Sequence, residues 1–419
     1  MSPLTEEERV RDAMDEWGKK RIRGLRKRDI NIDLFTKTDH IIDVIGVRRS
    51  GKTSILYLVA DSLKEEAVAY MNFEKRTLYP LNVQLLDELL KGMKRHRKAY
   101  LFLDEIQNVK GWERWAREVY DKDKGRIKIV VSGSSSRIIR KDVATILTGR
   151  HIPLKVFPLS FREFVRFKGG KHAEALLEEY ITFGGFPEVV LQDDPLLKRE
   201  ILAAYYDDII YKDILDKYGI QEKAVLENFV KFLFTNISGY FSYKRGKDYL
   251  DTLGIPTSTR TLLKYTSILE EVFLFFFVPI FAKKVREQAK YPKKEYAVDI
   301  GLRNIAYSGE DFGRKAENLV FLELQKRGGD INYWRSKEGK EVDFVIRDGH
   351  HVRELIQVTW NMEDEMTRAR EIQGIVLAAH EFGKGDALII CKDEERTVVT
   401  DKVTIRIVPL WKWLLNEKR

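Results

Sequence analysis

Cysteine, proline and long apolar runs are scarce in this chain of 419 residues. Cys391 is the only cysteine, which excludes an internal disulfide and any metal site built from several cysteines. The 10 prolines form no proline-rich linker, and the chain has no internal repeat or low-complexity tract. We therefore expect closely packed domains that need no covalent cross-link.

No segment has the length and composition of a membrane span. The longest apolar run, residues 272–282, is interrupted by Pro279 and is far shorter than the ~20 residues that a bilayer requires. The N-terminal residues 1–8 are rich in glutamate and lack the apolar core of a secretory signal. We expect a cytoplasmic protein that does not associate with membranes.

Charge is abundant and slightly unbalanced. Lysine and arginine number 74 against 65 acidic residues, which gives a net charge of +9 and a pI near 9.2. The apolar content of 44% suffices for several hydrophobic cores, so the length predicts two or three domains. The basic excess is compatible with an anionic partner but does not require one.

A phosphate-binding loop is the clearest motif. Residues 46–53 match G-x-x-x-x-G-K-[ST] and directly follow the apolar run 41–45. Such a loop wraps backbone N–H groups around phosphate oxygens, and the helix that begins there directs its positive end at the same anion. The motif predicts an ATP or ADP site formed by Gly46, Arg48, Arg49, Ser50, Gly51, Lys52, Thr53 and Ser54, with Lys52 on the β and γ phosphates and Thr53 on Mg²⁺.

A second motif lies about fifty residues downstream. The unbroken apolar run 100–103 leads into Asp104 and Glu105, as in a Walker B strand. A strand without polar alternation is buried on both faces, and parallel sheets bind ligands at the carboxyl ends of their strands. We expect Asp104 to hold Mg²⁺ and Glu105 to polarise the attacking water. The alternative is that both acids merely cap the next helix.

Two further segments provide candidate catalytic groups. The strand 128–131 ends in the serine-rich segment 132–136, where Ser135 is our candidate sensor of the γ-phosphate, although such a segment is also an ordinary turn. Arg150 precedes another apolar stretch and could complete a neighbouring subunit's site as an arginine finger. That role would require a homo-oligomer, and the alternative is an ordinary solvated arginine.

Together these segments resemble the archaeal ATPase family of AAA+/STAND-type P-loop ATPases. The resemblance rests on the P-loop, on residues 104–107, 132–136 and 148–150, and on the segment 157–164. It continues through Gly184-Gly185-Phe186-Pro187-Glu188, which resembles an element of the family's helical lid and implies that Pro187 packs near the adenine. The same residues could form a plain Gly-Gly-Pro turn between two helices.

The segment after the lid resembles a winged helix. Residues 247–250 predict one helix, 253–256 a turn and Ser258 the start of a second helix, while 274–279 and 295–299 predict a hairpin. The positive charge that we assign to the tip of this hairpin comes from Lys283, Lys284, Arg286, Lys290, Lys293 and Lys294. Such a surface is suited to DNA phosphates, although winged helices also bind proteins.

The last hundred residues resemble a restriction-endonuclease core. Glu317 on a helix and Asp343 at the start of a strand match the acids that hold Mg²⁺ in that class, and Gln357 stands where the second strand acid belongs. Thr359 stands where the class has its lysine, which makes catalysis doubtful unless Lys337 or Lys340 replaces it. The pattern around Asp343 is also that of an ordinary strand.

We therefore predict an α/β protein with a P-loop parallel sheet and helical lid, a winged-helix module and a C-terminal nuclease-like α/β domain. The expected domains are 1–165 for the ATPase core, 166–235 for the lid and connecting helices, 236–308 for the winged helix and 309–419 for the nuclease-like domain. The predicted function is Mg²⁺-dependent ATP hydrolysis coupled to DNA. The alternatives are a signalling or scaffold ATPase that binds protein and an ATP-regulated nuclease.

Overall fold

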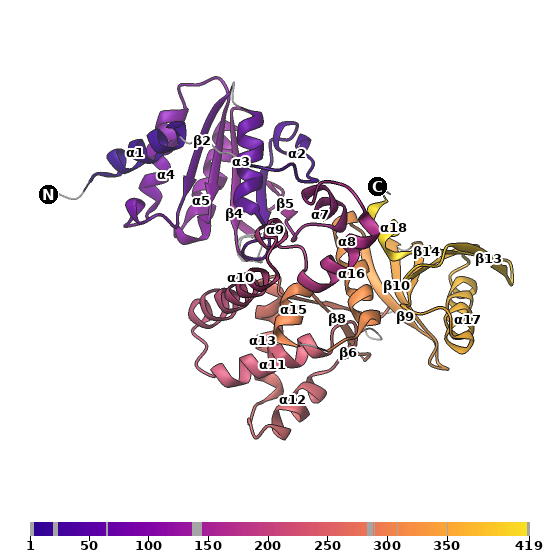
Figure 1. The fold of residues 1–419 in the computed structure, drawn as a ribbon. Coiled ribbons are helices and arrows are strands. Elements are labelled where there is room, and N and C mark those ends of the chain that lie inside the picture. Colours follow the sequence, from indigo (N-terminus) through magenta and orange to yellow (C-terminus); the bar gives the residue numbers. More distant parts are fainter. Residues whose placement is uncertain are drawn as a thin grey trace. The chain divides into compact units, whose positions relative to one another are not determined.

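The computed structural model describes residues 4–19, 24–63, 66–135, 145–282, 288, 290–307, 309–349 and 351–416 (Figure 1). The chain divides into two compact units, Met1–Phe157 and Pro158–Arg419. Within the described residues, no helix has both the length and the apolar composition to cross a membrane.

The first unit is built on a parallel sheet of five strands in the order β2-β3-β4-β1-β5. All residues of β1, β3 and β4 are buried, as expected for strands whose apolar residues do not alternate with polar ones. The strands are β1 (Ile41–Ile45), β2 (Ala67–Asn72), β3 (Ala99–Asp104), β4 (Ile127–Gly133) and β5 (His151–Lys155).

Helices cover both faces of this sheet. In Figure 1, α3 lies on one side of it, and α4 and α5 lie on the other. The helices of the unit are α1 (Glu6–Lys19), α2 (Asp33–Thr36), α3 (Lys52–Ser62), α4 (Val83–Met93) and α5 (Trp112–Asp123). The core under α3 contains Ile42, Phe102 and Val130 from three adjacent strands. The predicted P-loop sheet is confirmed.

The second unit begins with a run of helices. They are α7 (Phe161–Phe167), α8 (Ala173–Phe183), α9 (Pro187–Leu191), α10 (Pro195–Asp207), the π-helix Asp208–Asp216 and α11 (Lys223–Thr235). Pro187 occupies the first turn of α9, where a missing N–H is harmless. The preceding Gly184-Gly185 turn is held by Asp299, whose Oδ2 accepts from the Gly185 N–H at 2.7 Å.

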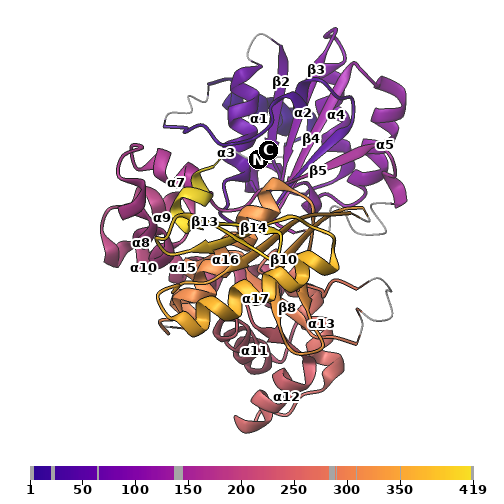
Figure 2. The same ribbon diagram turned by 90° about the vertical axis from the view of Figure 1, so that its right-hand side faces the viewer.

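A small module follows, whose helices α12 and α13 can be seen in Figure 2 and whose three-stranded sheet has the order β6-β8-β7. Its elements are β6 (Tyr240–Phe241), α12 (Tyr243–Thr252), α13 (Thr259–Glu271), β7 (Phe275–Val278), β8 (Lys293–Ala297) and α15 (Ile300–Ala306). Ser258 caps α13 by accepting from the Thr261 N–H at 3.0 Å, as predicted. Strand β8 ends two residues before Asp299, which instead caps α15.

One assignment on this hairpin is wrong. Lys294 does not lie at an exposed tip: it is inside β8, opposite Tyr240 and Val278, and its side chain is 3% exposed. Lys290 and Lys293 are exposed as expected. Lys283, Lys284 and Arg286 lie outside the described residues.

The C-terminal part of this unit contains a mixed sheet of six strands in the order β13-β14-β12-β11-β10-β9. Its core includes Val345, Ile375 and Ile389. The elements are α16 (Phe312–Arg327), β9 (Asp330–Arg335), β10 (Glu341–Asp348), β11 (His351–Val358), α17 (Glu365–Glu381), β12 (Asp386–Cys391), β13 (Arg396–Thr400), β14 (Val403–Pro409) and α18 (Leu410–Leu415).

Candidate functional site

The P-loop joins the carboxyl end of β1 to the start of α3. A Cβ atom on Gly46 would lie 2.0 Å from the Val156 carbonyl oxygen, so the close approach of these two backbones requires glycine. Gly51 has φ 97° directly before the first residue of α3, a conformation that also favours glycine. Both motif glycines therefore have a steric reason.

Buried polar groups surround this loop. The Lys52 ammonium donates to the carbonyls of Gly46 and Val47, each at 3.1 Å. Arg28, which precedes β1, donates to the carbonyl oxygens of Ser50 at 2.9 Å and Phe157 at 3.0 Å. These two hydrogen bonds connect the P-loop to the segment that follows β5. The Ser50 hydroxyl is buried and has no hydrogen-bond partner among the described residues.

The predicted pair Thr53 and Asp104 is brought together. The Thr53 hydroxyl donates to Asp104 Oδ2 at 2.8 Å, although the residues are 51 positions apart. Asp104 is fully buried at the end of β3. The contact depends on the parallel sheet, because α3 starts at the same edge where β3 ends.

Three other donors to Asp104 were not predicted. Tyr70 donates its hydroxyl to Oδ2 at 2.7 Å, and the Asn72 amide donates to the same oxygen at 3.3 Å. Ser132 donates to Oδ1. Asn72 ends β2 in register with Asp104, and Ser132 lies near the end of β4. A search for polar residues at the ends of adjacent strands would have found both.

Glu105 follows with a left-handed backbone, φ 55° and ψ 43°. This conformation is uncommon for a residue other than glycine and is found disproportionately at functional sites. The Glu105 N–H donates to the Ser132 hydroxyl at 3.1 Å, and its carboxylate accepts from the Gln107 amide. Glu105 does not cap a regular α-helix: a short 3₁₀ turn, Ile106–Asn108, follows.

The other predicted site residues, two serines and two arginines, differ in how far they are buried. Ser135 is buried two residues after the end of β4, whereas Ser132 is the serine that contacts Asp104. Arg49 is exposed with φ 67°, and Arg48 lies 3.7 Å from the Glu74 carboxylate. Ser54 is half-buried in the first turn of α3.

Arg150 lies at the amino ends of the parallel strands, and the P-loop lies at their carboxyl ends. It directly precedes β5, and its carbonyl accepts from the N–H of Ile41, the first residue of β1, at 2.8 Å, whereas the P-loop follows the last residue. Its guanidinium forms a two-point ion pair with Asp121, at 2.8 and 3.2 Å, which raises the pKa of Arg150. Within one chain Arg150 therefore cannot reach the P-loop, and a finger role needs a second copy.

These residues fit a nucleotide with Mg²⁺. The buried Ser50 hydroxyl, which has no hydrogen-bond partner among the described residues, could donate to an anion held by this loop. The Thr53 hydroxyl and the Asp104 carboxylate are oxygen donors of the kind that Mg²⁺ prefers. They meet at the carboxyl edge of the sheet, where phosphates would lie.

A second acid cluster is present in the C-terminal unit. Glu317 of α16 and Asp343 of β10 are both buried, and both contact the Lys294 ammonium, at 3.0 and 2.7 Å. Glu341 completes the cluster at 2.5 Å from the same ammonium. The basic group on these acids is therefore Lys294 from β8, which sequence reasoning had placed on the surface.

The other positions of the nuclease-like pattern have structural partners. Gln357 accepts from the Asp343 N–H at 3.0 Å and donates to Glu371 at 2.7 Å. The Thr359 hydroxyl donates to the Asn361 carbonyl at 3.3 Å. Among the residues that the structure describes, no three histidine, cysteine or acidic side chains are arranged to hold a metal ion.

Comparison with known families locates an ATPase domain on the first sheet. Residues 38–165 match an AAA domain, and residues 174–312 and 312–413 match two different domains of unknown function. A Walker-type ATPase of Pyrococcus abyssi is a structural neighbour with 15% identity and a TM-score of 0.46, covering 68% of this chain and 99% of that one.

Full-length relatives extend the comparison across the chain. The uncharacterized protein MJ1544 of Methanocaldococcus jannaschii is 34% identical over 414 residues, which cover 93% of this chain and 91% of that protein. An uncharacterized protein of Haemophilus influenzae is 31% identical, covering 91% of this chain and 96% of that protein. With its P-loop, its Asp104-Glu105 strand end and its AAA domain, this chain belongs to the archaeal ATPase family.

Proposed function

We propose that this protein hydrolyses ATP with Mg²⁺ and couples hydrolysis to the binding or movement of DNA. The observation that carries the hydrolytic part is the 2.8 Å contact between Thr53 and Asp104, with Glu105 as the next residue. A hydroxyl and a carboxylate at the phosphate edge, followed by a second carboxylate, are the groups that phosphoryl transfer to water needs.

Each residue has a role in this proposal. Lys52 would exchange its loop carbonyls for phosphate oxygens, Thr53 and Asp104 would hold Mg²⁺, and Glu105 would orient the attacking water. Bound Mg²⁺ supplies charge neutralisation at the phosphates. The hydrogen bond from Gln107 supports this role for Glu105, because it restrains the orientation of the carboxylate.

Three roles are proposed beyond this set. Ser132 is a better candidate for the γ-phosphate sensor than Ser135, because its hydroxyl contacts both Asp104 and the Glu105 N–H. Pro187 would pack near the adenine. Arg150 of a second copy would act as the finger after release from Asp121, so we propose a homo-oligomer.

DNA contact is proposed for the module around α12 and α13. The order helix, strand, two helices and antiparallel hairpin in this module is that of a winged helix, and α13 exposes Arg260 and Lys264 next to Ser258. Basic side chains of this kind contact phosphates and give salt-dependent binding of low sequence selectivity.

A protein partner is the first alternative. Leu253, which follows α12, and Leu263 of α13 are 47% and 55% exposed beside these basic residues. A contiguous exposed apolar patch marks a protein interaction site, and in this alternative the two leucines would belong to one. Binding to DNA that is lost at ~100 mM salt, together with tight binding to a protein, would support this alternative.

A metal-dependent nuclease is the second alternative, and Lys294 argues against it. The ammonium contacts three carboxylates in a buried cluster, where a divalent cation would have to displace it. Metal-dependent cutting that disappears in Asp343→Ala would establish the nuclease. Absence of cutting with both Mg²⁺ and Mn²⁺ would exclude it.

The test of the main proposal is ATP hydrolysis by the purified full chain, with and without duplex, single-stranded and branched DNA. We expect Lys52→Ala to abolish nucleotide binding, and Glu105→Gln to keep binding and stop turnover. Wild-type turnover in Glu105→Gln would refute the assignment of Glu105. Turnover that no DNA stimulates at any salt concentration would refute the coupling to DNA.

The DNA surface is tested by a charge-matched pair of variants. Arg260→Ala with Lys264→Ala should weaken DNA binding and reduce its dependence on salt concentration. Lys91→Ala with Lys122→Ala removes the same charge from exposed helix positions of the ATPase unit and should leave DNA binding unchanged. Equal losses in both variants would mean that only net charge matters.

A further inference from the structure

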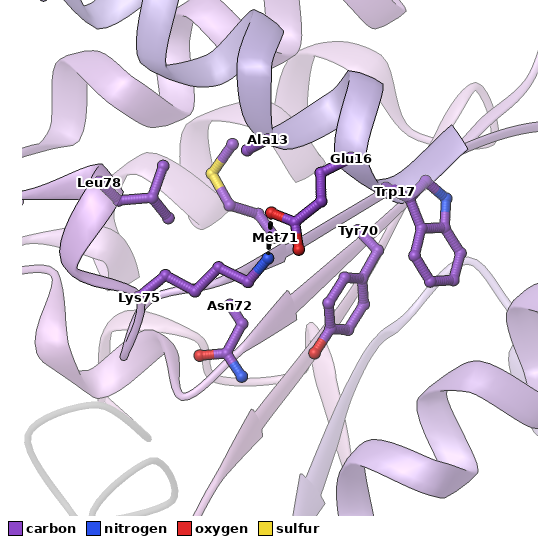
Figure 3. A pocket seen from close by; sticks show the side chains of 8 residues that line it. All are labelled: Ala13, Glu16, Trp17, Tyr70, Met71, Asn72, Lys75 and Leu78. Carbon is purple, nitrogen blue, oxygen red and sulfur yellow. Dashed lines mark ion pairs between the residues drawn. The ribbon is translucent and has the colours of Figure 1, made fainter. Parts of the chain in front are cut away.

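Helix α1 is attached to the carboxyl end of β2, next to the acid at the nucleotide site. Figure 3 shows a pocket between α1, the end of β2 and the following turn, with Tyr70 and Asn72 on its wall. Both of these side chains donate to Asp104 Oδ2. The pocket is therefore one side chain away from the proposed Mg²⁺ ligand.

Tyr70 is held firmly in this position. Its ring contacts Trp17 of α1, with ring centres 4.9 Å apart, and Tyr57 of α3, at 4.8 Å, and these two rings also stack on each other at 5.5 Å. The Tyr70 side chain is buried, and its hydroxyl donates to Asp104 Oδ2 at 2.7 Å. These ring contacts fix the position of the hydroxyl that donates this hydrogen bond.

Specific contacts attach α1 to the rest of the unit. The Arg9 guanidinium donates to the carbonyl oxygens of Leu78 at 2.7 Å and Pro80 at 2.9 Å, and its side chain is 5% exposed. Glu16 pairs with Lys75 at 2.5 Å, as the dashed line in Figure 3 marks. Contacts at both ends of the helix hold Trp17 against Tyr70.

The matched AAA domain starts at residue 38, so α1 lies outside it. If α1 only covered the edge strand β2, apolar contacts with that strand would be sufficient. Here one of its side chains packs on a residue that donates to the buried Asp104 carboxylate. The contact therefore links an element outside the domain to the chemistry of the site.

We propose that Tyr70 is a positioning residue for Asp104, and that α1, through Trp17, is part of the machinery that sets the Mg²⁺ dependence of this ATPase. This inference rests on the proposed function. The Tyr70 hydrogen bond restrains rotation of the carboxylate, so that Oδ2 stays beside the Thr53 hydroxyl. Without it, Asp104 has fewer fixed donors and must be ordered again each time the cation binds.

The test compares Tyr70→Phe with Tyr120→Phe, which removes a hydroxyl from a buried tyrosine of α5 in the same unit. A hydrogen bond to a charged group contributes about 1.5–3 kcal/mol, so we expect Tyr70→Phe to raise the Mg²⁺ concentration for half-maximal hydrolysis about tenfold or more. Nucleotide affinity measured in EDTA should stay at the wild-type value. The Tyr120 variant should match the wild type in both measurements.

Two substitutions of Trp17 test whether α1 contributes to the Mg²⁺ dependence. Trp17→Leu should shift the Mg²⁺ dependence in the same direction by a smaller factor, and Trp17→Phe should largely restore it by replacing the ring. An unchanged Mg²⁺ dependence in both Tyr70→Phe and Trp17→Leu, with wild-type turnover, would overturn this inference and leave the ATPase proposal standing.

The two proposals fail in different ways. If the wild type does not hydrolyse ATP, the contribution of the Tyr70–Asp104 hydrogen bond can be measured by binding instead. The measurement is the Mg²⁺ dependence of ADP binding, followed with a fluorescent ADP analogue. A shift in Tyr70→Phe would then support the positioning role without turnover. Mg²⁺-independent ADP binding in the wild type would overturn both proposals.

Discussion

The two buried acid clusters of this protein are stabilised in opposite ways. At the end of β3, the Asp104 carboxylate accepts from three hydroxyls and one amide, those of Thr53, Tyr70, Ser132 and Asn72. In the C-terminal unit, Glu317, Asp343 and Glu341 gather around the ammonium of Lys294. Among the described residues, the first cluster is held by neutral donors and the second by a cation of the chain.

This difference separates a site that can take a cation from one that already contains its own. Neutral donors orient a carboxylate but leave its charge uncompensated, which suits it to a divalent ion. An ammonium within 3.0 Å compensates the charge directly, so a metal ion would have to displace a buried side chain. Similar acid content in a sequence therefore does not imply similar chemistry.

Electrostatics in the second cluster agrees with this description. Burial raises the pKa of the Glu317 carboxyl to about 8, with the charge of Asp343 acting in the same direction. Burial acts to lower the pKa of Lys294, but the neighbouring acids, Asp343 foremost, outweigh it and raise the pKa well above the ordinary value. Lys294 therefore stays charged at neutral pH.

Removal of this internal cation should have the largest effect on stability. Lys294→Met removes the cation beside the buried Glu317 and Asp343 and the partly exposed Glu341, and breaking a buried ion pair in this way costs about 3–5 kcal/mol. The measurement is the free energy of unfolding in urea. Lys293→Met, at the exposed neighbouring position, is the control and should unfold like the wild type. Equal stability of the two variants would mean that Lys294 does not hold the cluster together.

The contrast predicts that only the first cluster responds to Mg²⁺. A ligand at 100 times its Kd stabilises a folded protein by about 2.7 kcal/mol, so Mg²⁺ with ADP should raise the melting temperature of the wild type more than ADP in EDTA does. Asp104→Asn should lose this difference. Asp343→Asn lowers the starting stability but should retain the full shift with Mg²⁺ and ADP. Loss of the shift in both variants would contradict the distinction between the clusters.

A third effect is expected on the pH dependence of stability. With its pKa raised from 4.5 to about 8 by burial, Glu317 keeps a proton in the folded state that the unfolded chain loses. Its contribution is therefore fully present below about pH 4.5 and is lost as the pH rises toward 8, at roughly 1 kcal/mol per pH unit within that window.

Glu317→Gln isolates this contribution. The variant cannot titrate at this position, yet its side-chain oxygen can still accept from Lys294 and Tyr296. The unfolding free energy of the wild type minus that of the variant should fall between pH 5 and pH 8. A difference that is constant with pH would show that Glu317 is ionised throughout.

Much of the first unit was predictable because its determinants are local. The P-loop needs its two glycines for steric reasons, and the apolar runs at 41–45 and 100–103 become buried parallel strands in β1 and β3. In the second unit, Ser258 caps α13 because a hydroxyl accepts from an N–H three residues away. The motif spacing, the apolar runs and the cap are all patterns of neighbours along the chain, whereas the contact that requires glycine at position 46 comes from Val156.

The parts that were missed depend on residues brought together from afar. Tyr70 and Asp104 are 34 positions apart, and nothing in the sequence near residue 70 reveals that the Tyr70 hydroxyl donates to a carboxylate. Asp299 reads as the end of a strand, yet it holds the turn at Gly185, 114 positions away. Lys294 looks like one more surface lysine in a basic segment.

The amino-acid order alone was sufficient for the nucleotide loop, the acidic strand end and the alternation of strands and helices, because hydrogen bonding and hydrophobic burial within short segments specify them. Which acids keep an uncompensated charge depends on the register of whole strands. A shift of one residue in β8 would turn Lys294 to the other face of the strand, and that choice is made by the packing of the whole unit.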